Sequence, residues 1–156
     1  MQVKIANYFQ KTSHMEYRSS GPISSALDVI GDKWSLLIIR DIIFYGKNNF
    51  SEFEKSPEGI SSNILADRLQ MLVEERILTK HKDPTNRKRI NYKITPKGVD
   101  LLPVLVEMII WSDEYLNISN EAREFATRLN AHKDGIIKQM MREIKVTESA
   151  EIKSEV

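Results

Sequence analysis

The sequence predicts a mainly α-helical protein with one small β-hairpin. Three observations lead to this fold class. Apolar residues recur at helical spacing over most of the chain, the period changes to alternation only between residues 78 and 95, and Pro/Gly turns separate the short segments. A length of 156 residues suffices for one domain with a sizeable core. We therefore expect one domain with helical additions at its ends.

Composition and charge exclude several classes of function. The chain has no cysteine, which rules out disulfides, thiolate catalysis and cysteine-based zinc sites. A net charge of +1 argues against binding polyanions over the whole surface, although it is compatible with a localised basic patch. No apolar run approaches the roughly 20 residues that a membrane span needs. We therefore expect a cytoplasmic protein without a membrane partner.

The first part of the chain is predicted to form an arm and two helices. Residues 1–20 mix polar and aromatic residues without a lasting period and are interpreted as an arm. Pro22 suits the first position of a short helix, and Asp32 is the predicted N-cap of the next helix, over residues 33–44. Lys33 stands where the helix dipole disfavours a cation. We interpret it as a candidate phosphate contact, with a solvated surface lysine as the alternative.

Two further helices are predicted on either side of a Pro/Gly turn at residues 56–59. Ser51 and Glu54 have capping-box spacing, which predicts a short helix before the turn. Ser61 is the predicted N-cap of the helix after the turn. Apolar side chains of that helix share one stripe, namely Leu65, Leu69, Leu72 and Val73.

The opposite face of this helix carries short polar and amide side chains, which are Ser61, Ser62, Asn63, Asp67 and Gln70. Most of them can both donate and accept hydrogen bonds, as the base edges in a DNA major groove require. We interpret the segment as a DNA recognition helix. An ordinary amphipathic helix is the alternative.

Alternation next predicts two strands, Leu78–Lys82 and residues 89–95, joined by the turn-forming residues 83–88. Residues 80–97 contain seven cations and one anion, and seven minus one gives a local charge of +6. Such a hairpin can neutralise phosphates. The candidate contacts to the DNA backbone or minor groove are Arg87, Lys88 and Arg89. A solvated hairpin whose lysines prevent edge-to-edge aggregation is the alternative.

A recognition-type helix followed directly by a basic hairpin is the pattern of a winged helix-turn-helix. Thr95 and Pro96 open a further helix, in which Pro103 should kink or restart the backbone. Its apolar residues cover nearly the whole circumference, so part of it should meet a second copy of the chain. The predicted interface residues are Leu105, Met108, Ile109, Trp111 and Leu116.

Residues 119–145 hold two more amphipathic patches, with a predicted break at Asp134-Gly135. The expected domain organisation is an N-terminal arm (1–20), a winged helix-turn-helix DNA-binding domain (21–98), C-terminal dimerisation helices (99–146) and a frayed tail (147–156).

Recognisable catalytic chemistry is missing from the sequence. The three histidines, His14, His81 and His132, are isolated, and the scattered glycines form no phosphate loop. Carboxylates stand beside lysines and arginines on helix faces, as in ordinary solvated surfaces. We therefore expect no enzyme activity, no metal and no cofactor.

Several segments resemble the HxlR-type winged helix-turn-helix transcriptional regulators. They are Ala-Leu-Asp-Val-Ile-Gly-Asp-Lys-Trp at 26–34, Phe-Ser-Glu-Phe at 50–53, Gly-Ile-Ser at 59–61, Leu65, Arg68, Leu69 and Leu72, and Tyr-Lys-Ile-Thr-Pro-Lys-Gly at 92–98. The resemblance implies a homodimer whose terminal helices form the interface and whose two recognition helices read a palindromic operator in double-stranded DNA. Many such proteins have Cys-Pro where this chain has Gly21-Pro22, so sensing through a thiol there is not available. The chain also extends past the usual family end, beyond Leu116.

Other interpretations stay open. A winged-helix module that binds protein instead of DNA would use the apolar C-terminal helices, and its affinity would depend little on salt. MarR-type and PadR-type regulators share the winged architecture, although residues 28–34 fit them less well. A pocket for an unknown small-molecule effector, lined by Met108, Trp111 and Phe125, is a further hypothesis.

Overall fold

The computed structural model describes residues 17–154, with side chains over residues 17–146, so most of the expected N-terminal arm lies outside the described residues. The elements of the described part are α1 (Pro22–Ile30), α2 (Ser35–Tyr45), α3 (Phe50–Glu54), α4 (Ser62–Glu74), β1 (Leu78–Lys82), β2 (Ile90–Ile94), α5 (Pro96–Val99), α6 (Leu102–Tyr115), α7 (Asn120–Ala131) and α8 (Lys133–Ser154). The prediction of a mainly helical fold with one hairpin is confirmed.

The core of the winged domain lies between α2, α3, α4 and the base of the hairpin. The predicted apolar stripe of α4 is buried, with Leu65, Leu69 and Leu72 each at most 1% exposed. They pack with Ile39 of α2 and Phe53 of α3. The stripe faces inward, so the opposite face of α4 is left for solvent or a partner.

The hairpin is an antiparallel pair whose register runs from Leu78 opposite Ile94 to Lys82 opposite Ile90. The loop after α2 adds a short bridge, Asn49 opposite Asn91. At the hairpin's base, the Thr95 hydroxyl donates to the carbonyl of Arg76 at 2.7 Å. These contacts fix the base of the hairpin to the helices that precede it.

Two helix starts differ from the sequence predictions, the first in its position and the second in the residue that caps it. Asp32 accepts hydrogen bonds from the amides of Trp34 and Ser35, and α2 begins at Ser35, two residues later than predicted. Asn49, rather than Ser51, caps α3, because its side chain accepts from the amide of Glu52 at 3.2 Å.

The start of α4 follows the prediction in position only. Ser61 is the N-cap residue of α4, but its hydroxyl makes no capping hydrogen bond. Its extended backbone still allows the Ser61 carbonyl to accept from the amide of Leu65 at 2.9 Å, the first hydrogen bond of the helix.

Thr95 caps α5 as predicted, accepting from the amide of Gly98 at 3.1 Å. That helix ends at Val99, and α6 restarts at Leu102 with a proline in its first turn, as expected for Pro103. The predicted break at Asp134-Gly135 is wrong, since α7 ends at Ala131 and α8 runs through Gly135 to Ser154. Helical backbone therefore continues into the region expected to fray.

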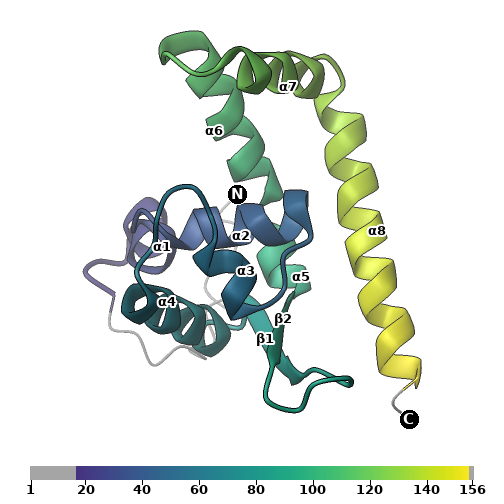
Figure 1. Cartoon of the computed structure of the whole chain (residues 1–156). Helices are drawn as coiled ribbons and strands as arrows, with labels where there is room; N and C mark the ends of the chain where they lie inside the picture. Colours follow the sequence, from purple (N-terminus) through teal and green to yellow (C-terminus); the bar gives the residue numbers. More distant parts are fainter. Residues whose placement is uncertain (1–16, 155–156) are drawn as a thin grey trace, which may run out of the picture.

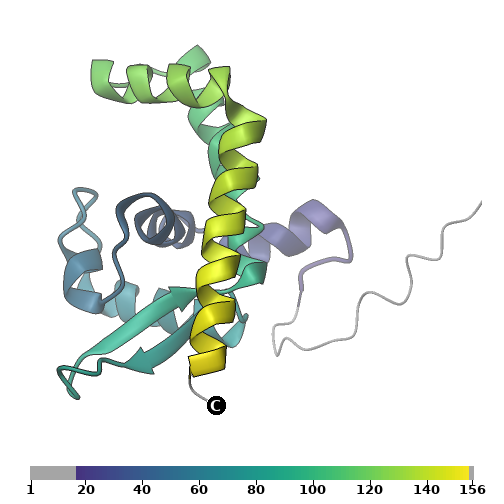
Figure 2. The same ribbon diagram turned by 90° about the vertical axis from the view of Figure 1, so that its right-hand side faces the viewer.

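The last three helices form a projection from the winged domain. Figure 1 shows α6 leaving the domain, α7 crossing at the far end, and α8 returning toward the level of the hairpin; Figure 2 shows the same return path from the side. The inner face of α8 is packed on its own chain through Ile136, Ile137, Met140, Met141 and Ile144. Among the described helices, none is both long enough and apolar enough to cross a membrane.

Candidate nucleic-acid interface

The outward face of α4 carries the predicted base-reading residues, and their side chains differ in how far they are already engaged. Asn63 is exposed and, within residues 17–146, its side chain has no hydrogen-bond partner. Gln70 donates to Glu74 one turn later at 2.7 Å. Asp67 pairs with Arg68, although its side chain stays 67% exposed. The face is therefore accessible, with one free amide near its N-terminal end.

Ser62 and Lys33 are placed differently from these three residues. The Ser62 hydroxyl donates to Glu54 and so links α4 to α3. Lys33 lies in the turn before α2, not in its first helical turn, and its ammonium group sits 5.1 Å from the centre of the Trp34 ring. The dipole argument for Lys33 therefore does not apply, and a cation–π contact holds its side chain instead.

Four of the seven cations between residues 80 and 97 fall into two groups. Arg89 forms an ion pair with Asp83 at 2.7 Å, and Lys97 donates to the carbonyl of Glu75 at 2.6 Å. By contrast, the exposed side chains of Arg87 and Lys88 make no hydrogen bond or ion pair with any described residue. The tip thus presents two unpaired cations, while Arg89 is committed to a partner within the hairpin.

Asp83 is the centre of the hairpin tip. Its carboxylate accepts from the Thr85 hydroxyl at 2.7 Å, the Thr85 amide at 2.8 Å, the Asn86 amide at 2.9 Å, the Asn91 amide group at 3.0 Å and Nε of Arg89 at 2.8 Å. These bonds, first of all those from the side chains of Thr85 and Asn91, hold the pKa of Asp83 well below its usual range. The carboxylate is therefore ionised and saturated with donors.

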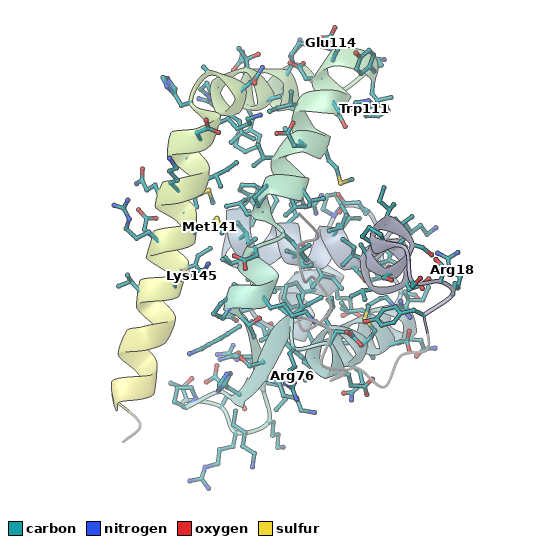
Figure 3. The ribbon with its side chains drawn as sticks, turned by 180° about the vertical axis from the view of Figure 1, so that it is seen from behind. Arg18, Arg76, Trp111, Glu114, Met141 and Lys145 are labelled. Carbon is teal, nitrogen blue, oxygen red and sulfur yellow. The ribbon has the colours of Figure 1, made fainter. Side chains whose placement is uncertain are left out.

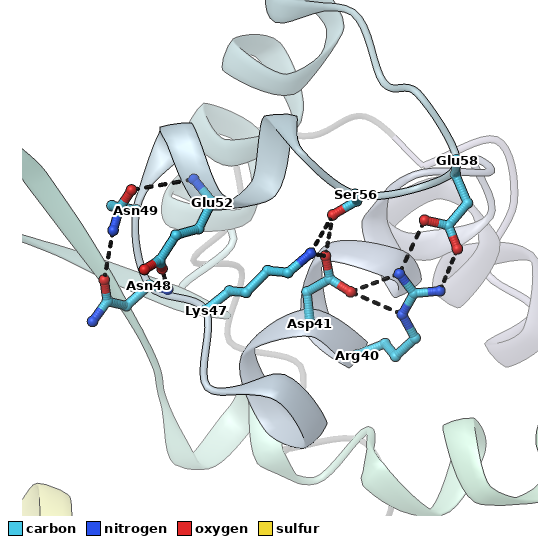
Figure 4. A network of polar contacts seen from close by, with 8 residues as sticks. All are labelled: Arg40, Asp41, Lys47, Asn48, Asn49, Glu52, Ser56 and Glu58. Carbon is cyan, nitrogen blue, oxygen red and sulfur yellow. Dashed lines mark hydrogen bonds and ion pairs between the residues drawn. The ribbon is translucent and has the colours of Figure 1, made fainter.

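A second polar network lies beneath the turn that leads into α4 (Figure 4). Asp41 of α2 accepts from Nε of Arg40 at 2.9 Å and from Nζ of Lys47 at 2.7 Å, and the Ser56 hydroxyl donates to it as well. Arg40 also pairs with Glu58 within the turn. The network ties α2 to the loops before and after α3, which fixes the entry of the chain into α4.

The charge state of Asp41 depends on this network. Burial by itself would raise the pKa of the carboxyl, but the hydrogen bonds from Lys47, Ser56 and Arg40 outweigh burial and lower it. Arg40 has its pKa raised further above an already high value, chiefly by Glu58. Both groups are therefore charged at neutral pH.

Sequence reasoning missed both carboxylate centres. For Asp83 a signal was present, since it is the single anion among seven cations between residues 80 and 97. For Asp41 the signal was the charged pair Arg40-Asp41 inside an otherwise apolar helix. Neither signal predicts the hydrogen-bond partners of the two carboxylates, because these partners depend on how the loops fold onto them.

A stripe of exposed apolar side chains runs along α6, away from the hairpin and α4. Its members are Val104 (41% exposed), Met108 (49%), Trp111 (56%) and Tyr115 (67%). Their spacing of four, three and four residues places them on one face of the helix. Figure 3 shows Trp111 on the side of α6 opposite to Met141 of α8. This face is therefore not the one that α8 covers.

The predicted interface residues divide accordingly. Met108, Trp111 and Leu116 are exposed. Leu105, however, is 6% exposed and packs in the core of its own chain, and Ile109 packs against the cluster formed by α6, α7 and α8. Leu105 thus packs within its own chain, and its place in an interface between two copies stays a prediction.

The residues expected to line an effector pocket are packed against other rings. Phe125 contacts Phe44 edge-on with ring centroids 5.9 Å apart, and Trp111 packs on Tyr115 at 5.5 Å. A cavity of about 10 Å³ lies elsewhere, between α2 and the turn before α4. It has room for about one water molecule.

A family model described as HxlR-like helix-turn-helix matches residues 29–120. The HTH-type transcriptional regulator Rv3095 of Mycobacterium tuberculosis is 33% identical over 105 residues, which are 67% of this chain and 65% of that protein. The chain thus spans just under two thirds of that relative's length. YodB of Bacillus subtilis, also an HTH-type transcriptional regulator, is 31% identical over 93 residues, 60% of this chain and 82% of that protein.

Solved structures resemble the winged part of the chain. PA1607, described as a candidate transcription factor, superposes with a TM-score of 0.59 at 40% identity, over 66% of this chain and 70% of that one. A candidate MarR-family regulator from Porphyromonas gingivalis W83 gives a TM-score of 0.55 at 27% identity, over 65% of this chain and 99% of that one. These likenesses confirm the winged helix-turn-helix fold.

Proposed function

The chain belongs to the HxlR-like helix-turn-helix family of transcriptional regulators, and from this premise we propose that it binds specific DNA sequences as a homodimer. One observation carries the proposal: α4, whose polar residues are exposed, and the basic hairpin lie at the same end of the molecule, away from α7 (Figure 1). One duplex can contact both, since a recognition helix reads base edges while a wing contacts the backbone.

We propose that α4 enters the major groove. Asn63, Asp67 and Gln70 would face the bases, because their side chains point away from the buried leucine stripe. An amide can bond an adenine through two hydrogen bonds, and a carboxylate can accept from a cytosine amino group. Ser61 and Ser62 stand at the N-terminal end of α4 and stay candidate DNA contacts, although the Ser62 hydroxyl already donates to Glu54.

The wing would supply phosphate contacts. Arg87 and Lys88 at the tip are the main candidates, supported by their exposure and unpaired side chains among the described residues. Arg89 is a weaker candidate than the sequence suggested, because it is paired with Asp83. Lys33 stays a candidate phosphate contact, held beside Trp34.

The homodimer would form through the exposed stripe of α6, with Met108, Trp111 and Leu116 in the interface. Exposed Ile23 and Leu27 of α1 extend the apolar surface available to a partner copy. A monomer rarely leaves such aromatic and aliphatic side chains together in water without a partner. A twofold dimer would read a palindromic operator whose half-sites are about 34 Å apart, or a multiple of that distance.

The proposed domain organisation follows this division of labour. Residues 21–98 would bind DNA and residues 99–146 would dimerise, with residues 1–20 as an arm and 147–156 as the tail. The restart at Leu102 supports a boundary close to residue 99. The packing of α8 on its own chain indicates that it supports α6 from behind.

Selection of bound sequences from random duplex DNA tests the proposal, with sedimentation velocity to measure the oligomeric state. Enrichment of a palindrome by a dimer is the expected result. Against the selected site, Asn63→Ala should lose about tenfold in discrimination over unrelated DNA, the effect of removing one bidentate base contact. Asn130→Ala, on the exposed surface of α7, is the matched control and should change nothing. No enriched sequence, or unchanged discrimination by Asn63→Ala, would contradict the proposal.

A further inference from the structure

We infer that Asp83 is a positioning residue which fixes the shape of the wing tip before DNA is bound. The inference rests on the proposed function and deepens it, since it assigns a role in DNA binding to an anion. A surface carboxylate inside a basic wing would ordinarily repel phosphates. The contacts of Asp83 indicate the opposite effect on binding.

The tip is built around this carboxylate. Five donors from Thr85, Asn86, Arg89 and Asn91 converge on its two oxygens. The backbone closes the same loop, because the amide of Asp83 donates to the carbonyl of Arg89 at 3.0 Å and the amide of Arg89 donates to the carbonyl of Asn86 at 2.8 Å. Although every neighbour from 84 to 89 is exposed, the Asp83 side chain is only 6% exposed.

The geometry gives Asp83 two effects. It engages Arg89, so that this guanidinium cannot move freely to phosphates. It also holds the backbone that carries Arg87 and Lys88, whose side chains have no partner among the described residues. A loop that is ordered in the free protein loses less conformational entropy when it binds. Asp83 therefore strengthens the contacts of the tip with DNA, although its ion pair makes Arg89 unavailable to phosphates.

The two possible roles of Asp83 predict opposite signs. If Asp83 acts only through its charge, replacing it with a neutral residue adds one positive charge, releases Arg89 and tightens binding. If it acts by positioning, the same change disorders the tip and weakens binding despite the more favourable charge. Because the signs differ, one affinity measurement separates positioning from charge.

The experiment measures the affinity of each variant for the selected duplex by fluorescence anisotropy at about 0.15 M salt and over a salt series. Asp83→Asn should bind about tenfold more weakly, equivalent to reordering one or two residues on binding. Asp83→Glu keeps the charge but cannot match the short turn, and should also bind more weakly. Glu124→Gln, on exposed α7 far from the wing, makes the same change in charge and should leave affinity unchanged.

Amide exchange of Thr85 and Asn86 in the free protein reports the order of the tip directly. Both amides should lose protection in Asp83→Asn, while amides of α4 keep theirs. Thr85→Val, which keeps the carboxylate and removes one donor, should show a smaller loss in the same direction and serves if Asp83→Asn does not fold.

Equal or tighter binding by Asp83→Asn, or tip amides that stay protected, would overturn the inference while leaving the proposed function intact. If the wild-type protein enriched no DNA sequence, the proposed function would fail and the inference with it.

Discussion

Two buried carboxylates organise the end of the molecule that carries α4 and the hairpin, and they differ in where their hydrogen-bond partners come from. The Asp41 side chain is 3% exposed and that of Asp83 6%. Asp41 takes donors from Lys47 and Ser56, six and fifteen residues away, and so joins α2 to both ends of α3. The partners of Asp83 all lie within residues 85–91, inside a single hairpin.

Because their partners come from different parts of the chain, the two clusters should differ in how far the loss of each is felt. The Asp41 cluster can form only when the helices are packed, so its loss should be felt by the whole domain. The bonds of Asp83 can open while the rest of the fold stays packed, because local units of a protein open at lower free energy than the global unit. The first sets the position of α4, and the second sets the shape of the wing tip.

The largest effect is expected from Asp41→Ala. It leaves Lys47 without its anion and Arg40 with Glu58 alone, and both cations are about one fifth exposed. Breaking a buried ion pair in this way costs about 3 kcal/mol in the free energy of unfolding, less than for a fully buried pair because both cations reach water. Urea denaturation measures it. Asp83→Asn should cost less, and an equal or larger loss for Asp83→Asn would break the comparison.

Gly98→Ala tests whether the base of the wing unfolds only together with the whole domain. An added Cβ would lie 2.5 Å from the carbonyl oxygen of Ile77 and 2.6 Å from Cγ1 of Ile94. Overpacking against backbone should lower the free energy of unfolding by about 2 kcal/mol.

The matched control for this change is Gly135→Ala on α8, where an added Cβ meets nothing within 4 Å. It should raise stability by about 0.5 kcal/mol, the ordinary gain from alanine in a helix. If Gly98→Ala left the free energy of unfolding unchanged in urea denaturation, the base of the hairpin would adapt to the added Cβ. The base would then open as locally as the tip.

Acid should weaken the Asp41 cluster by a smaller amount, since a proton removes the charge but leaves the side chain in place. The folded-state pKa of Asp41 lies below the ordinary 3.8. Its contribution to stability is therefore fully present above 3.8 and is lost as pH falls toward the folded-state pKa.

Urea midpoints over a pH series should thus fall less steeply for Asp41→Asn than for the wild-type protein. The slope should not vanish, because the pKa values of Asp32 and Glu58 are lowered too. Parallel curves for the two proteins would show that the Asp41 charge is not linked to folding.

Periodicity predicted the parts of the fold that depend on one element at a time. The leucine stripe of α4 and the two strands follow from spacing alone, because spacing determines which side chains share a face. The interface on α6 could not be assigned the same way. Its apolar residues surround the helix, and only the return of α7 and α8 decides that Ile109 is covered and Trp111 is not.

The candidate DNA site shows the same limit. Exposed amides on α4 and cations on the wing were named from the sequence, since exposure follows from the buried face. The pairing of Arg89 with Asp83, and of Gln70 with Glu74, reduced the set of free side chains. Such pairings depend on side-chain geometry at the tip and along the helix, which a charge count does not contain.

The smallest effect is expected at Arg76, which joins α4 to β1 and so lies between the two regions (Figure 3). Its φ of 57° is left-handed, while its amide donates to Val73 and that of Ile77 donates to Leu72 at 2.9 Å, the hydrogen bonds of a Schellman motif. Glycine adopts this conformation without steric cost.

Arg76→Gly should therefore stabilise the protein by about 0.5 kcal/mol, after subtracting the greater freedom of glycine in the unfolded chain. Arg76→Ala, which removes the guanidinium but keeps Cβ, should give no gain. If urea denaturation showed both variants equally stabilised, the Arg76 side chain and not its backbone conformation would be the source of strain. The backbone of Arg76 would then not be what fixes the wing relative to α4.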